Sequence, residues 1–205
     1  EKGAQIVQDL GRLAQAGGSG LGAHIIPLAV QHSASIGMDV WLYALALGAA
    51  NILILQTGTE APQYTSLLAQ EKSVLDAILQ GMAYGAGQVQ LIEAKQAQEL
   101  EIALAAVPVQ RLCTRPAATF SLAANKRSAI DFALAYFLEH ANQEVEDILL
   151  PMGAPFGALI VNTEACTLCM ACVGACPAAA LQDNLNQPEL KFIESNCVQC
   201  GLCVS

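Results

Sequence analysis

Seven cysteines near the C-terminal end of the chain have a spacing that suits metal chemistry. Four of them, spaced C-x2-C-x2-C-x3-C and followed directly by a proline, are Cys166, Cys169, Cys172 and Cys176. The other three, spaced C-x2-C-x2-C, are Cys197, Cys200 and Cys203. Three thiolates at this spacing on one tight loop can reach three corners of an iron–sulfur cube, and the cysteine before the proline ligates the other cube. The pattern therefore predicts two [4Fe–4S] clusters.

The two cysteine runs are related by a constant offset. Each cysteine of the second run lies 31 residues after its counterpart, and the residues before the runs keep this offset, Leu159 with Leu190 and Val161 with Phe192. The same rule places the counterpart of Cys176 at position 207, two residues past the last residue of the sequence. The complete four-thiolate site is then Cys176, Cys197, Cys200 and Cys203. The second site, whose fourth ligand lies outside this sequence, is Cys166, Cys169 and Cys172.

Zinc and disulfide bonds are the alternatives for so many cysteines. Structural zinc sites use paired C-x2-C knuckles, whereas this chain has two runs of three cysteines and a proline after the first run. Disulfides are typical of secreted proteins, and the N-terminal residues show no signal-peptide pattern. We therefore expect iron as the metal, reduced thiols and a cytoplasmic protein.

Residues 159–205 resemble a bacterial two-cluster [4Fe–4S] ferredoxin module, with a strand expected before each cysteine run. The resemblance implies a small α+β domain in which two clusters exchange electrons. The wider chain is similar to proteobacterial multidomain ferredoxin-like proteins, in which an α/β region precedes the sequence APFGA, here residues 154–158. The α/β region is loosely similar to the iron–sulfur subunit associated with hydrogenases and heterodisulfide reductases.

One position departs from the ferredoxin pattern. The residue after the second cysteine of a run is commonly glycine in that family, as Gly201 is, but the first run has Met170 there. We expect the methionine side chain to cover the neighbouring sulfur and to exclude water from the first cluster. Shielding of this kind shifts the potential of a cluster.

The composition describes a chain able to bury a large core. Apolar residues make up 54% of the 205 residues and charged residues only 13%, which excludes disorder over most of the length. The net charge of −9 argues against a nucleic-acid partner, which needs a basic stripe, and favours a basic docking partner. The longest charge-free apolar stretch, residues 40–55, is shorter than the roughly 20 residues of a transmembrane helix, so we expect no membrane span.

Strand and helix patterns alternate in the first half of the chain. Short apolar runs predict strands at residues 24–30, 52–55 and 89–92, although a proline weakens the first of these. Helical spacing predicts helices at residues 6–13, 40–47, 62–82 and 96–106. The alternation predicts an α/β fold, with a parallel sheet covered by helices.

We expect three parts in the chain. Residues 1–110 form the α/β domain, residues 111–157 a helical connector and hinge, and residues 158–205 the ferredoxin-like [4Fe–4S] domain, truncated at its C-terminal end. The connector contains apolar residues at helical spacing, which predict a helix that docks on a core. These residues are Ile130, Ala133, Leu134, Phe137 and Leu138.

The α/β domain shows no explicit site of its own. Its glycine loop, residues 18–23, fits a loose dinucleotide fingerprint but follows a helix, whereas a pyrophosphate loop must follow a strand. The expected carboxyl ends of its strands, near residues 31–35, 56–59 and 93–94, are polar but offer no charged cradle. Cys113, the eighth cysteine, is typical of a small buried residue.

Two functions remain open from the sequence. In the first, the clusters pass single electrons to redox protein partners, a dehydrogenase or a reductase, and the α/β domain is a docking or scaffold region. In the second, the chain is a subunit of a larger oxidoreductase whose α/β domain binds a flavin, a nucleotide or a substrate. We favour the first, with no catalytic site in the chain itself, because the cluster ligands are explicit and a substrate site is not.

Overall fold

The computed structural model of the protein describes residues 2–108, 116–121, 125–141, 143–145 and 147–204. Contacts divide the chain into two compact units, Glu1–Leu149 and Leu150–Ser205, and each is described here by itself. The three-part division expected from the sequence, with boundaries after residues 110 and 157, stays a prediction.

The N-terminal unit is built on two parallel strands. Strand β1 (Ile52–Gln56) pairs with strand β2 (Val89–Glu93) over five residue pairs, and helix α3 (Pro62–Gly81) connects them. Both strands are short apolar runs, as strands covered on both faces should be. Pro62 stands in the first turn of α3, where its missing N–H has no partner to lose. The strands expected at residues 52–55 and 89–92 and the long helix after them are confirmed.

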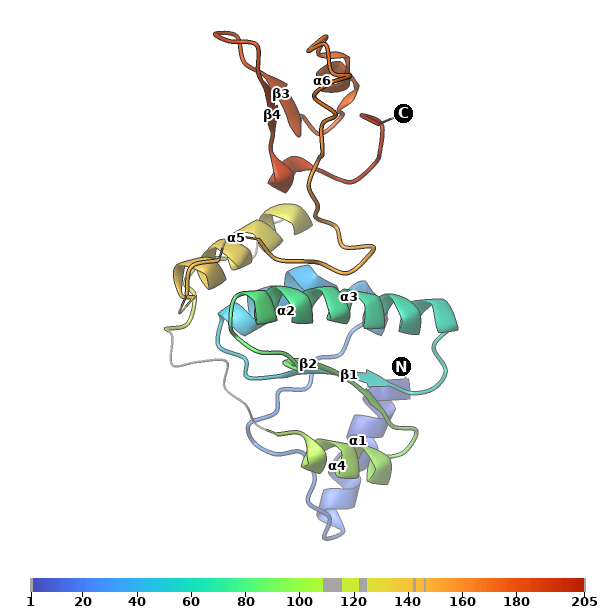
Figure 1. The fold of residues 1–205 in the computed structure, drawn as a ribbon. Helices are drawn as coiled ribbons and strands as arrows, with labels where there is room; N and C mark the ends of the chain where they lie inside the picture. Colours follow the sequence, from blue (N-terminus) through green and yellow to red (C-terminus); the bar gives the residue numbers. More distant parts are fainter. Residues whose placement is uncertain (1, 109–115, 122–124, 142, 146, 205) are drawn as a thin grey trace. The chain divides into compact units, whose positions relative to one another are not determined.

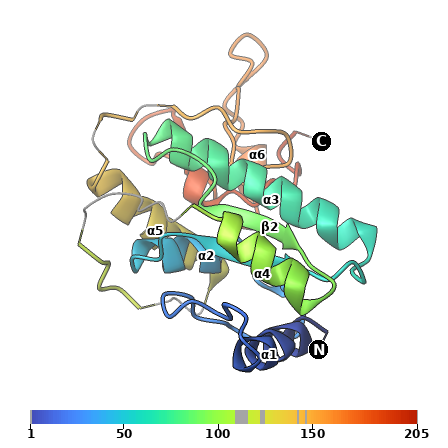
Figure 2. The same ribbon diagram turned by 90° about the horizontal axis from the view of Figure 1, so that it is seen from below.

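One face of the two strands is covered by helices α1 (Lys2–Gln15) and α4 (Ala97–Ala106). Figure 1 shows both helices below the strands, and Figure 2 views the molecule from that side. Ile6 and Leu10 of α1 and Leu100 of α4 are buried in one cluster, against which Leu55 of β1 and Ile92 of β2 pack.

The opposite face is covered by α3 and helix α2 (Met38–Ala46), and helix α5 (Lys126–Glu139) packs on α2, as Figure 1 shows. Helix α2 is apolar on most sides and is almost entirely buried, as its sequence predicts. Its Trp41 is 1% exposed, and Phe137 of α5 is fully buried. The Tyr84 hydroxyl donates a hydrogen bond of 2.7 Å to the backbone carbonyl of Phe137, which fastens α5 to the end of α3. The docking helix expected in the connector is therefore present, although its Leu138 is exposed.

The prediction of a strand at residues 24–30 is wrong. These residues form neither strand nor helix, and Ile26 and Leu28 are 81% and 79% exposed. Pro27 has no N–H to donate to a strand ladder, and the apolar side chains face solvent instead of a core. Only the short helix η1 (Ser33–Ser35) follows before α2. Among the described residues the sheet therefore has two strands, and helices cover it on both faces.

The C-terminal unit contains helix α6 (Ala171–Ala175), strands β3 (Leu181–Asp183) and β4 (Leu190–Phe192), and the short helix η2 (Glu194–Asn196). The two strands pair antiparallel, Leu181 opposite Phe192. The resemblance to a two-cluster ferredoxin implies a strand before each cysteine run, but residues 159–161 form none, and no described strand lies beside them.

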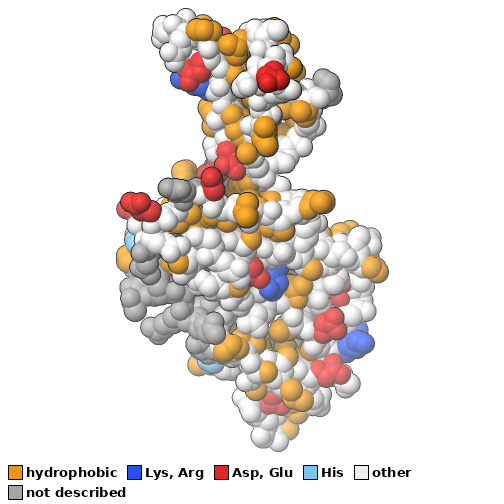
Figure 3. Space-filling model, in the orientation of Figure 1, with side chains coloured by type: hydrophobic (Ala, Val, Ile, Leu, Met, Phe, Trp, Pro, Cys, Tyr) orange, Lys and Arg blue, Asp and Glu red, His pale blue; other side chains and the backbone are white. Residues whose placement is uncertain are grey.

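Very little of the C-terminal unit is core. Ala180 and Leu181 are the only buried hydrophobic residues among its described residues, whereas the N-terminal unit buries a large set that includes Trp41 and Phe137. Figure 3 shows apolar side chains on the visible surface of the C-terminal unit. Among the described residues of the whole chain, no helix combines the length and apolar character that crossing a membrane requires.

Candidate metal centre

The two cysteine loops share one backbone conformation. Leu168 and Gln199, which are 31 residues apart, both have left-handed backbones, with φ of 54° and 57°. Met170 and Gly201 are related in the same way, with φ of 60° and 75°. A left-handed residue on each side of the middle cysteine curls the loop, so that three thiols at C-x2-C-x2-C spacing can face one point. The repeat found in the sequence therefore extends to the backbone.

Turns place the first cysteine of each run. The side-chain oxygen of Asn162 accepts hydrogen bonds from the N–H groups of Glu164 and Ala165, at 3.1 and 3.2 Å. The backbone carbonyl of Asn162 accepts a hydrogen bond from the Cys166 N–H at 2.9 Å. In the second run η2 takes the place of this turn, and Cys197 N–H donates to the carbonyl of Glu194 at 2.9 Å. Asparagine favours such turns because its side chain can replace a backbone acceptor.

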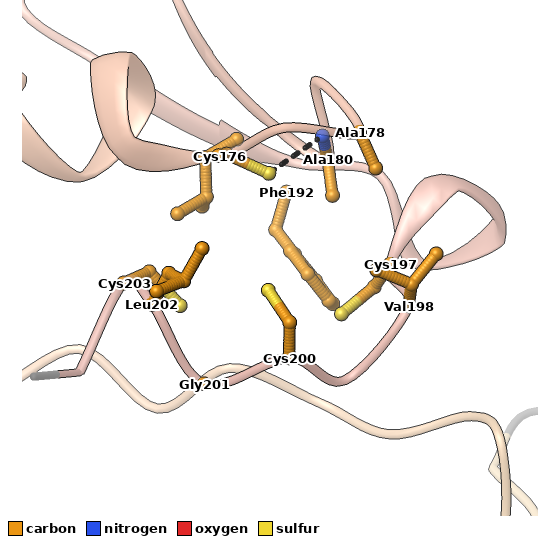
Figure 4. A pocket seen from close by; sticks show the side chains of 11 residues that line it. Cys176, Ala178, Ala180, Phe192, Cys197, Val198, Cys200, Gly201, Leu202 and Cys203 are labelled. Atoms are coloured by element: carbon orange, nitrogen blue, oxygen red, sulfur yellow. Dashed lines mark hydrogen bonds between the residues drawn. The ribbon is translucent and has the colours of Figure 1, made fainter.

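Four of the cysteines surround one open space, which we call the cysteine hollow. The residues that contribute sulfur to it are Cys176, Cys197, Cys200 and Cys203. Its volume is about 350 Å³, including space open to solvent, and its walls are otherwise mostly apolar, with Phe192, Val198 and Leu202 among them. Figure 4 shows these side chains around the hollow.

Cys176 reaches the hollow from a different segment than the other three cysteines. It follows α6, and Pro177 and three alanines then lead the chain around its sulfur. Ala180 N–H donates a hydrogen bond to Cys176 Sγ at 3.2 Å, drawn dashed in Figure 4. The backbone N–H of Leu181, together with N–H groups of the alanines, lowers the pKa of the Cys176 thiol, because these donors stabilise the thiolate.

These features fit a [4Fe–4S] cluster. Cluster iron is held by thiolates, and backbone N–H groups directed at the sulfurs compensate their charge. The apolar walls suit a group that needs restricted access of water. The described side chains offer no group of three or more histidine, cysteine and acidic residues tight enough for a single metal ion. The four thiols instead lie around a space, as a cube of several atoms requires.

The cysteines of the first run stand apart from this hollow. Cys166 and Cys172 are half-buried and Cys169 is exposed, and none of the three lines the cysteine hollow. The pKa of the Cys169 thiol is lowered by a hydrogen bond from the Ala171 N–H and by one from the Thr167 hydroxyl. The four cysteines predicted for the complete site line one hollow, and the assignment of the other three to a second cluster stays a prediction.

Met170 has the backbone conformation that glycine usually supplies. Its φ of 60° and ψ of 16° are left-handed, which costs a residue with a Cβ roughly 1–2 kcal/mol. The usual glycine at this position is therefore a requirement of the backbone. The expected covering of the sulfur by the Met170 side chain stays a prediction.

Reasoning from the sequence missed Thr167, which lowers the pKa of the Cys169 thiol, and it missed the donors that follow Cys176. The first could have been found by comparing the two runs position by position, since Val198 stands at the matching place. The second depends on how the backbone of the alanines curls, and Ala179 has a positive φ of 50° that nothing in the sequence indicates. Cys113 lies outside the described residues.

Comparison with known proteins decides the cofactor. Residues 158–205 match the family model of the 4Fe-4S dicluster domain, which covers both cysteine runs. The cofactor of this part of the chain is the [4Fe–4S] cluster. The C-terminal part of the chain is ferredoxin-like, and its chemistry is iron–sulfur electron transfer with redox partners. No curated protein and no solved structure matches the chain.

The polar loops of the N-terminal unit are occupied by carboxylates of the chain itself. After β1, Glu60 accepts hydrogen bonds from the N–H groups of Thr57 and Thr59, at 2.9 to 3.1 Å, and from the Thr57 hydroxyl at 3.0 Å. Partial burial alone would raise the pKa of Glu60, but these hydrogen bonds outweigh it and the pKa is lowered. After α1, Glu101 accepts from the N–H groups of Ser19 and Gly20 in the glycine loop, at 2.5 and 3.3 Å.

Proposed function

We propose that the chain carries single electrons between two redox proteins through [4Fe–4S] clusters, and that its N-terminal unit docks or orients the cluster domain. The cluster supplies the chemistry when bound, since it accepts and releases one electron without a change of ligands. The observation that carries the proposal is the cysteine hollow, where thiols from two separate segments surround one space.

The ligand assignment is part of this proposal. Cys197, Cys200 and Cys203 hold one cluster together with Cys176, because all four line the same hollow. Cys166, Cys169 and Cys172 hold the other cluster, because their loop has the same backbone conformation. From the 31-residue repeat we infer that the fourth ligand of that site is a cysteine at position 207.

The protein residues around the hollow have three tasks in this proposal. The thiolates bind iron, and the N–H groups after Cys176 stabilise their negative charge. Phe192 and Leu202 keep water from much of the site. Val198, which is 61% exposed, forms part of an apolar rim beside the exposed Cys200, where an electron can enter or leave over a short distance.

The docking role of the N-terminal unit is supported by its loops and by its surface. The amide donors of its two polar loops already bind Glu60 and Glu101, so a phosphate group would have to displace a carboxylate. The segment 26–30, which is neither helix nor strand, exposes Ile26, Leu28 and Val30, by 81%, 79% and 40%. Exposed apolar side chains in one segment are typical of a surface that meets another protein.

The partners and the compartment follow from the same chemistry. A one-electron carrier needs a donor and an acceptor, which we propose are a dehydrogenase and a reductase. The net charge of −9 favours partners with a basic docking surface. Cluster ligands must be reduced thiols when iron is inserted, so we propose a reducing compartment such as the cytoplasm.

An absorption spectrum of the anaerobically purified protein tests the proposed function. We expect a broad iron–sulfur shoulder that bleaches reversibly on reduction, with no resolved flavin bands. Calorimetric titration of the same protein with NADH, ATP and FMN should show no binding. A dissociation constant at or below about 10 μM, roughly −7 kcal/mol, would instead support a ligand-binding oxidoreductase subunit.

The variant Glu60→Ala tests whether this loop can bind a phosphate group once its carboxylate is removed, because the substitution frees the N–H groups of Thr57 and Thr59. If the loop is a scaffold, the nucleotides bind neither the natural protein nor this variant. Tight binding by the natural protein would show that the loop rearranges to accept a phosphate, and the docking role would be abandoned.

A further inference from the structure

The chain after α5 returns to the C-terminal end of α3 and is held there at two points. The side-chain amide of Gln143 donates a hydrogen bond of 3.4 Å to the backbone carbonyl of Gly81, the last residue of α3. The side chain of Ile148 lies on Gly81 itself: a Cβ atom placed there would be 2.8 Å from both γ carbons of Ile148 and 3.0 Å from its δ carbon. Residues 143–148, which we call the strap, therefore lie against the end of α3.

The glycine at position 81 is explained by this contact and not by its backbone. Gly81 belongs to α3 and has no positive φ, so its conformation would accept any helical residue. Glycine is a poor helix former, because it loses more backbone freedom than alanine does. The space that the missing Cβ leaves is filled by Ile148. Gly11 of α1 differs in this respect, since a Cβ there would meet nothing within 4 Å.

The strap ends where the N-terminal unit ends. Contacts divide the chain between Leu149 and Leu150, so Ile148 is among the last residues that the N-terminal unit holds. Ile148 is half-buried, whereas Leu149 is 94% exposed. The described residues 149–170 form no helix or strand. The contact of the strap with α3 therefore decides where the linker between the two units begins.

We propose that the strap is a conformational device that sets the length of the linker to the cluster domain. With the strap on α3, the linker runs over residues 149–157. With the strap released, the linker begins after His140, the C-cap of α5, and gains residues 141–148. A flexible linker lengthened in this way spans about 1.4 times the distance, and the local concentration of the linked unit falls about two- to threefold. The inference goes beyond electron transfer, because it depends only on contacts within the N-terminal unit.

Proteolysis of the full chain tests whether the contact at Gly81 holds the strap. A protease that cuts after glutamate is added, and the rate of cleavage after the exposed Glu144 is measured by fragment mass. Ile148→Ala removes the three carbons that contact Gly81, and Gly81→Ala introduces a Cβ into their space. We expect each variant to be cleaved about tenfold faster than the natural protein, because cleavage follows the population of the released strap. The matched control Gly11→Ala should be cleaved at the natural rate.

The double variant separates the contact from the effect of alanine on the helix. Once Ile148 is alanine, a Cβ at position 81 has space, so Gly81→Ala should add nothing to the cleavage rate. Denaturation followed by Trp41 fluorescence shows that the N-terminal unit of each variant is folded. An equal acceleration by Gly81→Ala with and without the Ile148 side chain, or no acceleration in either single variant, would overturn the strap.

Small-angle X-ray scattering on the same variants tests the length of the linker. We expect Ile148→Ala and Gly81→Ala to have a larger radius of gyration than the natural protein, and Gly11→Ala to match it. Rapid cleavage after Glu144 without a larger radius would show that the strap does not set the linker length, and would overturn the inference. These outcomes are independent of the proposed function: absence of iron and sulfide from the natural protein would overturn the electron carrier and leave the strap in place.

Discussion

The N-terminal unit has a core of buried side chains, whereas the C-terminal unit has few buried side chains and encloses the cysteine hollow. In the first, the N–H groups of the polar loops bind Glu60 and Glu101, and Trp41 and Phe137 fill the core. Among the described residues of the second, Ala180 and Leu181 alone are buried, and four thiols surround a hollow. The comparison teaches that the N-terminal unit has an apolar core of its own, whereas the C-terminal unit, with thiols around a hollow, needs its clusters to be complete.

Removal of iron should have the largest effect and should affect the two units differently. A chelator under reducing conditions should unfold the C-terminal unit, because a unit with two buried hydrophobic residues lacks the apolar burial to stay folded without its clusters. The N-terminal unit should stay folded. Amide hydrogen exchange with and without iron measures both units at once, and continued protection of β3 and β4 without iron would contradict the comparison.

Shortening a buried side chain of the N-terminal core should destabilise the N-terminal unit and leave the iron content of the chain unchanged. Phe137→Ala removes a fully buried ring, which typically costs about 3–5 kcal/mol of unfolding free energy. Iron content per folded chain should not change, because the ring belongs to the N-terminal unit. Phe132→Ala is the matched control, since Phe132 lies on the same helix and is 52% exposed. Chemical denaturation followed by Trp41 fluorescence measures the unfolding free energy of each variant. An equal loss of unfolding free energy in Phe137→Ala and Phe132→Ala would contradict the core described here.

Within the C-terminal unit, exchange of the two left-handed positions should have a smaller effect. Met170→Gly removes a backbone cost of about 1 kcal/mol, and Gly201→Met introduces it at the matching position. We expect the first variant to release iron to a chelator more slowly than the natural protein and the second to release it faster. Equal rates in both would show that the loops do not share one conformational requirement.

The smallest effect concerns Glu71 of α3. Burial, and then the nearby charge of Asp39, raise the pKa of Glu71, although Lys126 and the Met38 N–H act in the opposite direction. A raised pKa means that ionisation of Glu71 costs stability as the pH rises above the ordinary glutamate value of about 4.3. Glu71→Gln should therefore flatten the fall in melting temperature above that pH. A steeper fall in Glu71→Gln would show that the sign is wrong.

How much the sequence predicts depends on whether a feature is local. The cysteine spacing, the usual glycine at position 201 and the helix that begins at Pro62 are set within a few residues, and the sequence predicts them. The apolar run at 24–30 looks like a strand, but only the rest of the fold decides whether another strand lies beside it. Glu101 binds the glycine loop from 82 residues away, a contact that no local pattern indicates. The position of Cys176 in the hollow was predictable because Pro177 and the repeat together indicate it.

The crossed ligand set is the central claim, and Cys176→Ala tests it most directly. In the chain extended through position 207, electron paramagnetic resonance and iron analysis distinguish the two clusters. We predict that Cys176→Ala damages the cluster of Cys197, Cys200 and Cys203 and leaves intact the cluster of the cysteines nearest to it in sequence. The matched variant Cys172→Ala should do the reverse. An intact second-run cluster in Cys176→Ala would contradict the account.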